Sequence, residues 1–199
     1  SIAMRDMEIR GAGDLLGASQ SGQIATVGLD LFTRMIATAV KRLKAADDGG
    51  PLPVIMPEAT LIDLPLAAYV PTDYVPDGGL RLRLYRRMAL LDTMPAIDEM
   101  ARELADRFGP IPDPVNNLLY QLRIKVLAQR AHVAGVTTEM GQIRIRIAGL
   151  ENINRMGLQR YLGEGVRVSR KAIWMKRDLS TKEWQVALVR VLERLAAFL

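Results

Sequence analysis

Cysteine is absent from this 199-residue chain, and histidine occurs only once. Without thiols the chain forms neither disulfides nor thiolate metal sites, and we expect it to work in a reducing cytoplasm. Apolar runs of 18 residues are also missing, and the N-terminus lacks a basic and then apolar signal pattern. We therefore expect no segment that crosses a membrane or directs secretion.

Motifs of nucleotide binding and catalysis are missing as well. No G-x-x-x-x-G-K-[ST] occurs, and Gly11, Gly13 and Gly17 are spaced one residue too widely for the dinucleotide fingerprint. The single histidine, His132, lies on a predicted helix beside Arg130 with no obvious carboxylate partner, which favours packing or solvent exposure over catalysis. We expect no catalytic residue, no metal site and no cofactor in this chain, which is not an independent enzyme.

Positive charge is concentrated toward the C-terminus of the chain, whose net charge is +5. Residues 1–50 hold six basic and six acidic side chains, residues 51–110 hold six and nine, and residues 111–199 hold 15 and seven. A basic C-terminal half is compatible with DNA or an acidic partner, although solvated helix faces also carry such charge. The candidate phosphate contacts of a DNA-binding module are Arg144, Arg146, Arg155, Arg160, Arg167, Arg170, Lys171, Lys176 and Arg177.

Hydrophobic residues make up 49% of the chain, which is enough to build a core. The spacing of these residues predicts the secondary structure. The glycine content of residues 1–28 predicts an extended segment. From Leu29 onward, apolar residues recur at three- and four-residue steps, which predicts a helix. The sequence DDGGPLP, from Asp47, ends that helix and is the best linker candidate. Alternation over residues 60–66 then predicts a strand, which Pro65 places at a sheet edge.

Three helices follow with short connections. Asp77 is expected to cap the first, and the second runs from about Ala96 to Phe108, where Gly109 and Pro110 end it. The third opens at Asp113 as its N-cap and runs to about Val133, stopping before a glycine. These connections predict a helical layer.

Two hairpins occupy the last third of the chain. In the first, within residues 136–149, isoleucines alternate with Arg144 and Arg146, so the two kinds of side chain point to opposite faces. A helix over 152–162, a second hairpin of VRVS and AIWMK, and a helix from Thr181 to Phe198 complete the pattern. The expected fold is α+β, with a helical layer packed on a small, mostly antiparallel sheet and an extended N-terminal segment.

The sequence RDMEIRGAGDLLGASQSGQIATVGLDLF, residues 5–32, resembles the translocation motif of the bacterial transcription-repair coupling factor family. The related branched-DNA translocase RecG has a similar stretch. VPDGGLRLRLYRR and ELADRFGPIPDPVNNLL resemble the C-terminal domain of the coupling factors, so the resemblance covers residues 4–199, loosely in the final 60. The motif positions are Asp6, Glu8, Arg10, Gly11, Gly13, Gly17, Gln20, Ser21 and Gly22.

This resemblance implies a division of the chain and a parent protein. Residues 1–28 are the end of a motor domain, residues 29–50 a linker helix and linker, and residues 51–199 a C-terminal regulatory domain. The parent is an ATP-driven translocase of double-stranded DNA that removes stalled RNA polymerase and recruits the excision-repair protein UvrA. Its ATP and Mg²⁺ are expected to bind outside this chain.

The resemblance also assigns roles in the translocation motif. Arg10 and Gln20 are expected to couple ATP hydrolysis to movement. A guanidinium forms bidentate hydrogen bonds with phosphate, and an amide donates a hydrogen bond to the sugar-phosphate backbone of DNA without reading its bases. Ser21 can donate in the same way, and Asp6 and Glu8 are expected to orient Arg10. The glycines that let the backbone come close to phosphate are Gly11, Gly13, Gly17 and Gly22. A plain glycine-rich loop is the alternative.

A latch function for the C-terminal domain is the last expectation from the resemblance. The domain packs on the N-terminal UvrB-like module of the same protein, covers the UvrA-binding surface and restrains the motor. A releasable interface should be polar and modest in size. Glu99, Glu103 and Asp106 form one acidic stripe on their predicted helix, with Glu103 and Asp106 at the expected centre of the latch. A solvated helix face is the alternative.

Overall fold

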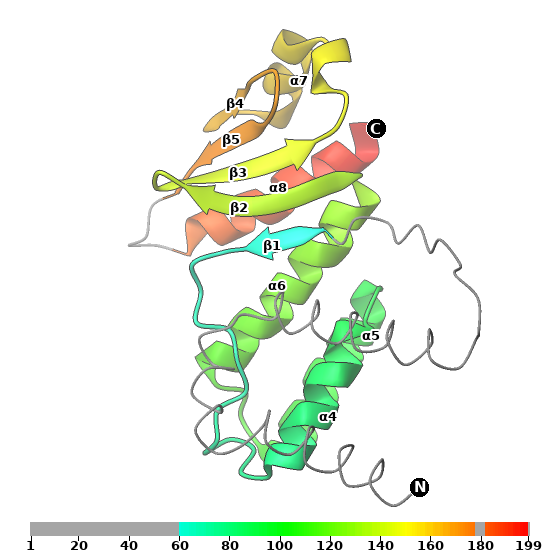
Figure 1. Cartoon of the computed structure of the whole chain (residues 1–199), viewed down its shortest axis with the longest axis vertical. Helices are drawn as coiled ribbons and strands as arrows, with labels where there is room; N and C mark the ends of the chain where they lie inside the picture. The colour runs from blue at the N-terminus through cyan, green and yellow to red at the C-terminus, as the bar shows by residue number, and fades with distance from the viewer. Residues whose placement is uncertain (1–59, 178–181, 199) are drawn as a thin grey trace, which may run out of the picture.

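The computed structural model describes residues 60–177 and 182–198. These residues form an elongated α+β molecule, with the sheet and two helices at one end and helices alone at the other, as Figure 1 shows. No helix in these two ranges is both long and apolar enough to cross a membrane. The elements, in chain order, are β1 (Leu61–Asp63), α4 (Gly78–Ala89), α5 (Met94–Phe108), α6 (Asp113–Arg130), β2 (Val133–Glu139), β3 (Gln142–Ile147), a 3-10 turn (Leu150–Asn152), α7 (Arg155–Leu162), β4 (Val166–Val168), β5 (Ile173–Lys176) and α8 (Glu183–Phe198).

The sheet has five strands in the order β1-β2-β3-β5-β4. Strand β1 runs parallel to β2, and the other three pairings are antiparallel, which confirms the mostly antiparallel sheet. Strand β1 is an edge strand, as the nearby proline predicts. Its parallel pairing was not anticipated from the sequence.

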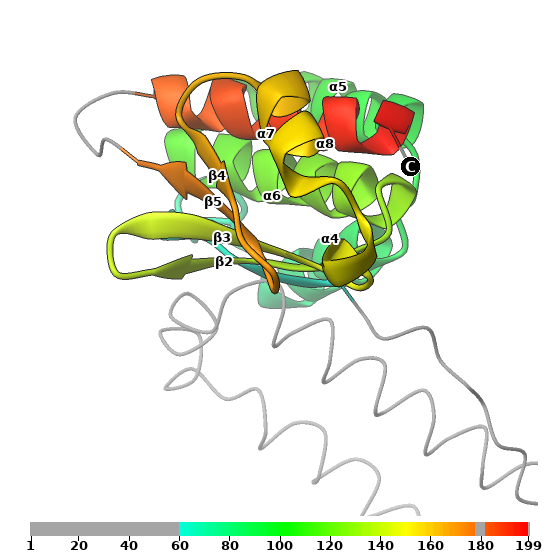
Figure 2. The same ribbon diagram turned by 90° about the horizontal axis from the view of Figure 1, so that it is seen from above.

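Helices α6 and α8 cover one face of the sheet, and α7 packs beside them against β4 (Figure 2). The isoleucines of β3 point to this side and are buried with residues of α6, α7 and α8. We call this cluster the sheet core. The alternation of β3 thereby places Arg144 and Arg146 on the opposite face, as expected from the sequence.

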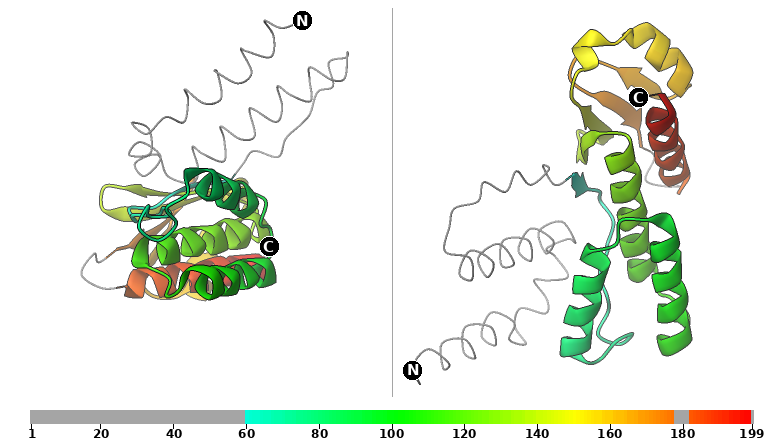
Figure 3. Two further views of the ribbon diagram at one scale, coloured as in Figure 1. Left: turned by 90° about the horizontal axis from the view of Figure 1, so that it is seen from below. Right: turned by 90° about the vertical axis from the view of Figure 1, so that its right-hand side faces the viewer.

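A second cluster, the helical core, fills the space among α4, α5 and α6, which run side by side away from the sheet (Figure 3). The segment between β1 and α4 is tied to these helices by two tyrosines. The Tyr85 hydroxyl accepts a hydrogen bond of 2.7 Å from the Val70 N–H, and the Tyr74 hydroxyl donates to the Leu104 carbonyl at 3.0 Å. Because buried backbone groups need partners, these bonds fix the path of an irregular segment.

Helix α6 belongs to both cores. Leu118 and Leu122 are fully buried in the helical core, whereas Ile124 and Ala128 are fully buried in the sheet core. A helix that is apolar on several sides is expected to be enclosed by its neighbours. This arrangement makes α6 the rigid connection between the two ends of the molecule.

Helix boundaries agree with local signals in some places and differ in others. Asp77 caps α4 by accepting a hydrogen bond from the Leu80 N–H, as predicted. Asp113 is not an N-cap as expected, because Pro112 holds that position and Asp113 is the first helical residue. Helix α6 ends at Arg130 rather than near Val133, which already begins β2.

The helix expected over residues 152–162 is shorter in the structure. A 3-10 turn precedes it, and α7 begins at Arg155, where the Asn154 side chain accepts a hydrogen bond of 3.0 Å from the Gly157 N–H. An asparagine in this position satisfies one of the free amide groups of the first turn. The local capping signal therefore decides the boundary.

Candidate interaction surfaces

The expected translocation residues lie outside the residues that the structure describes. This applies equally to the residues expected to touch DNA and to those expected to orient them. The residues concerned are Asp6, Glu8, Arg10, Gly11, Gly13, Gly17, Gln20, Ser21 and Gly22.

The expected latch stripe lies on α5, within the helical end of the molecule. Glu99 and Asp106 are exposed, whereas the Glu103 side chain is only 28% exposed. Two nitrogens of the Arg87 guanidinium, on α4, donate to the Glu103 carboxylate at 2.8 and 2.6 Å. Arg107, one turn further along α5, donates to the same carboxylate at 3.0 Å. Glu103 therefore joins α4 to α5.

The two guanidiniums also determine the charge of Glu103. Its hydrogen bonds with Arg87, and to a smaller extent with Arg107, lower the pKa of the Glu103 carboxyl from 4.5 to about 2, against the opposing effect of burial. The same contact raises the pKa of Arg87. At neutral pH the negative charge of Glu103 is compensated inside the chain. Glu99 and Asp106 are thus the members of the stripe that present their carboxylates to solvent.

Further polar contacts hold the three helices in place around the helical core. Arg123 of α6 donates to the Asp98 carboxylate of α5 at 2.7 Å. Lys125 of α6 donates to the Ala89 carbonyl, at the C-terminal end of α4, at 3.1 Å, where a cation is favourable. These contacts connect α6 to α5 and to the C-terminal end of α4, so they help to position α5 and its exposed side.

The candidate phosphate contacts are distributed over several parts of the sheet end. Arg155 and Arg160 lie on α7, Arg170 and Lys171 in the turn between β4 and β5, and Arg177 directly after β5. The others gather on the sheet face opposite α6 and α8. We call this surface the open sheet face and define it by Arg144, Arg146, Arg167, Trp174 and Lys176.

Trp174 occupies the centre of the open sheet face. In the strand register it is paired with Arg144 of β3 on one side and with Arg167 of β4 on the other. The two guanidinium carbons lie 5.5 and 5.6 Å from the centre of the tryptophan ring. Sequence analysis missed Trp174 as a site residue, although its alternation with Lys176 in AIWMK places both on one face.

Metal binding has no support in the described ranges, where no three potential ligands from His, Asp and Glu gather. His132, the one histidine, is exposed just beyond the end of α6. Its backbone has a φ of 51°, a conformation used to leave a helix. Solvent exposure was one of the two expected environments for this side chain.

Comparison with protein families and with curated proteins gives consistent matches. Residues 64–158 match the model of the TRCF domain. The chain is 37% identical over 142 residues to the transcription-repair-coupling factor of Mycobacterium tuberculosis (strain CDC 1551 / Oshkosh), which is 69% of this chain and 12% of the relative. It is 38% identical over 130 residues to that of Escherichia coli (strain K12), covering 65% of this chain and 11% of the relative. The chain thus spans about an eighth of the length of the curated relatives that it matches.

A solved structure has the same fold. The crystal structure of the C-terminal domain of a transcription-repair coupling factor superposes with a TM-score of 0.60 at 21% identity. The match covers 69% of this chain and 91% of that domain.

Proposed function

This chain belongs to the transcription-repair coupling factor family, and from that premise we propose that it is the C-terminal part of an ATP-driven translocase of double-stranded DNA. In this proposal the parent protein removes stalled RNA polymerase and recruits the excision-repair protein UvrA. The match of residues 64–158 to the TRCF domain carries the proposal. ATP and Mg²⁺ belong to the motor of the parent protein.

For residues 1–28 we propose a role in coupling ATP hydrolysis to movement along the DNA backbone. This role is supported by the resemblance of the segment to the translocation motif. In the full-length protein, Arg10→Ala combined with Gln20→Ala should retain ATP hydrolysis and lose displacement of a DNA-bound roadblock. Ser19→Ala, a change outside the motif positions, is the control. Displacement at the control rate by the double variant would remove this role.

For the terminal domain we propose an autoinhibitory latch that covers the UvrA-binding surface of the UvrB-like module. The exposed side of α5 is suited to such a contact, because Glu99 and Asp106 are exposed acidic groups seven residues apart on a helix that is anchored by its buried residues in the helical core. Exposed ion pairs contribute little each, so a contact built from them can be released. Glu103 supports this surface indirectly by holding α4 against α5.

Measurement of UvrA binding to the full-length protein tests the latch. Glu99→Lys combined with Asp106→Lys should raise the affinity for UvrA, because like charges would separate the domain from a basic partner surface. Glu151→Lys combined with Glu164→Lys changes the charge equally at the sheet end and should leave the affinity unchanged. Equal affinities of the two variants would exclude α5 as the latch surface. Charge reversal at Glu103 does not test the latch alone, because it also breaks the ion pair with Arg87 that joins α4 to α5.

A further inference from the structure

The open sheet face carries exposed basic side chains, and no helix of the described part packs on it: α6 and α8 lie on the other face of the sheet, and α4 and α5 lie below the sheet in Figure 1. Arg146, Arg167 and Lys176 are exposed on it, and none of the three forms an ion pair within the described residues. Arg144 is half-buried and donates to the Glu139 carboxylate at 2.9 Å. Four cations thus share a surface on which the strands β1 to β3 contribute two carboxylates, of Asp63 and Glu139.

The tryptophan holds two of these cations in place. Arg144 and Arg167 flank Trp174 from the two neighbouring strands at 5.5 and 5.6 Å. A guanidinium that contacts the face of an aromatic ring is held in position while its N–H groups can still bond other partners. Because the two arginines are separated by two strand spacings, their backbones lie roughly 10 Å apart. The charges are therefore ordered in a row across the sheet.

Gly135 makes room for a third cation. A Cβ atom added at this glycine would lie 3.0 Å from Nη2 of Arg146, which is closer than side-chain packing allows without a shift. The Arg146 side chain therefore extends across β2 at this point. The row of guanidiniums along β3 and β4 thus continues toward the edge of the sheet.

We propose that the open sheet face binds the sugar-phosphate backbone of DNA without reading its bases. Guanidiniums match phosphate oxygens with paired hydrogen bonds, and backbone contacts of this kind carry no sequence information. A protein partner is less well suited to this surface, because the centre of a protein interface is depleted of charge and rich in apolar groups. Here the one large aromatic side chain, Trp174, is already flanked by two arginines.

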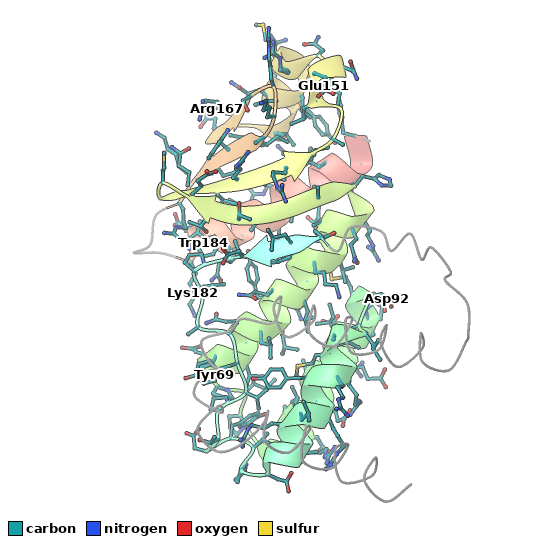
Figure 4. All side chains as sticks on the ribbon, in the orientation of Figure 1. Tyr69, Asp92, Glu151, Arg167, Lys182 and Trp184 are labelled. Carbon is teal, nitrogen blue, oxygen red and sulfur yellow. The ribbon has the colours of Figure 1, made fainter. Side chains whose placement is uncertain are left out.

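This inference goes beyond the latch and can fail separately from it. In Figure 4, Arg167 and Glu151 are labelled at the sheet end, whereas Asp92, in the connection between α4 and α5, is labelled about midway along the molecule, and the helical part continues away from the sheet beyond it. The latch concerns the exposed side of α5, whereas DNA binding concerns the opposite end of the long axis. A change on one surface leaves the other surface intact.

Binding of the 199-residue chain to a fluorescent DNA duplex, measured by anisotropy between about 50 and about 200 mM salt, tests the proposal. Each phosphate contact adds about −0.9 to the slope of log affinity against log salt, so Arg146→Gln combined with Arg167→Gln should make the slope shallower by about 1.8. The matched control is Arg155→Gln combined with Arg160→Gln, on α7, which removes the same charge. An equal loss in both variants would show that only net charge matters and would overturn the proposal.

Two further measurements locate the contact and identify the ligand class. Arg146→Lys combined with Arg167→Lys retains the charge and should restore the salt slope, which shows that the loss does not come from misfolding. Trp174 is half-buried and Trp184 is buried in the sheet core, so a change in tryptophan fluorescence on DNA binding should disappear in Trp174→Phe. Persistence of that change, or tighter binding of poly-glutamate than of DNA, would contradict the inference and favour an acidic protein partner.

Discussion

The contact of Glu103 with Arg87 and Arg107 gives a quantitative prediction about stability. Substitution Glu103→Gln keeps the shape of the side chain and removes its charge, so two guanidiniums lose their shared carboxylate. The helices α4 and α5 should then separate more easily. We expect a lower free energy of unfolding for the variant, since the bonds from Arg87 are short and paired.

The magnitude follows from the pKa of Glu103. A decrease from 4.5 to about 2 corresponds to roughly 3 kcal/mol at about 1.4 kcal/mol per pKa unit. The side chains of Arg87 and Arg107 are 52% and 46% exposed, so solvent screens much of this interaction. We therefore expect a loss of about 1 kcal/mol, which corresponds to a decrease of about 2–4 °C in Tm for a chain of this size.

The pH dependence identifies the carboxylate as the cause. Because its pKa is lower in the folded state, the ionised Glu103 stabilises the fold above its ordinary pKa and loses this effect as the pH falls toward about 2. The difference in free energy of unfolding between wild type and Glu103→Gln should be constant around neutral pH. It should decrease below about pH 4.5 and vanish near pH 2.

Urea denaturation followed by circular dichroism over this pH range measures the difference. Asp106→Asn is the control, because Asp106 is exposed on the same helix, and its effect should be below about 0.5 kcal/mol. If Glu103→Gln is no more destabilising than this control, or if its effect persists at the lowest pH, the contact does not stabilise the fold as argued.

Two substitutions in the interior should have larger effects. Tyr85→Phe leaves the buried Val70 N–H without the hydroxyl that accepts its hydrogen bond. Urea denaturation should show that the free energy of unfolding falls by about 1–3 kcal/mol. An unchanged free energy of unfolding would mean that this bond does not hold the segment between β1 and α4. Leu122→Ala removes a fully buried side chain from α6 and should lower the free energy of unfolding by about 2–5 kcal/mol. Since α6 joins the two cores, circular dichroism and tryptophan fluorescence should report one transition, and separate transitions would contradict this coupling.

Features decided by neighbouring residues could be predicted from the sequence. Asp77 caps α4, and Gly109 ends α5 with a φ of 86°, a conformation that favours glycine. The proline after β1 was enough to predict an edge strand. Each of these signals acts within a few residues, which is the range over which sequence patterns are informative.

Contacts between distant parts of the chain could not be predicted in this way. The parallel pairing of β1 with β2 joins Ile62 to Val136, and the contact of Glu103 with Arg87 joins two helices. The acidic stripe of α5 was visible in the sequence. The position of α4, however, determines which of its three carboxylates is paired with an arginine. This information comes only from tertiary packing.

The open sheet face was predicted in part. Alternation in β3 placed Arg144 and Arg146 on the side away from the helices, as the structure confirms. The strand order β3-β5-β4 is what places Trp174 between two arginines, because β5 lies between β3 and β4 in the sheet. A sequence pattern gives the side of a strand but not its neighbours.

Direct binding of this 199-residue chain to the UvrB-like module of its parent protein is the most direct test of the proposed latch. We expect a complex that wild-type UvrA displaces and that Glu99→Lys with Asp106→Lys weakens. No complex with the module, or a complex on which UvrA binds without competition, would contradict a regulatory domain that covers the UvrA-binding surface.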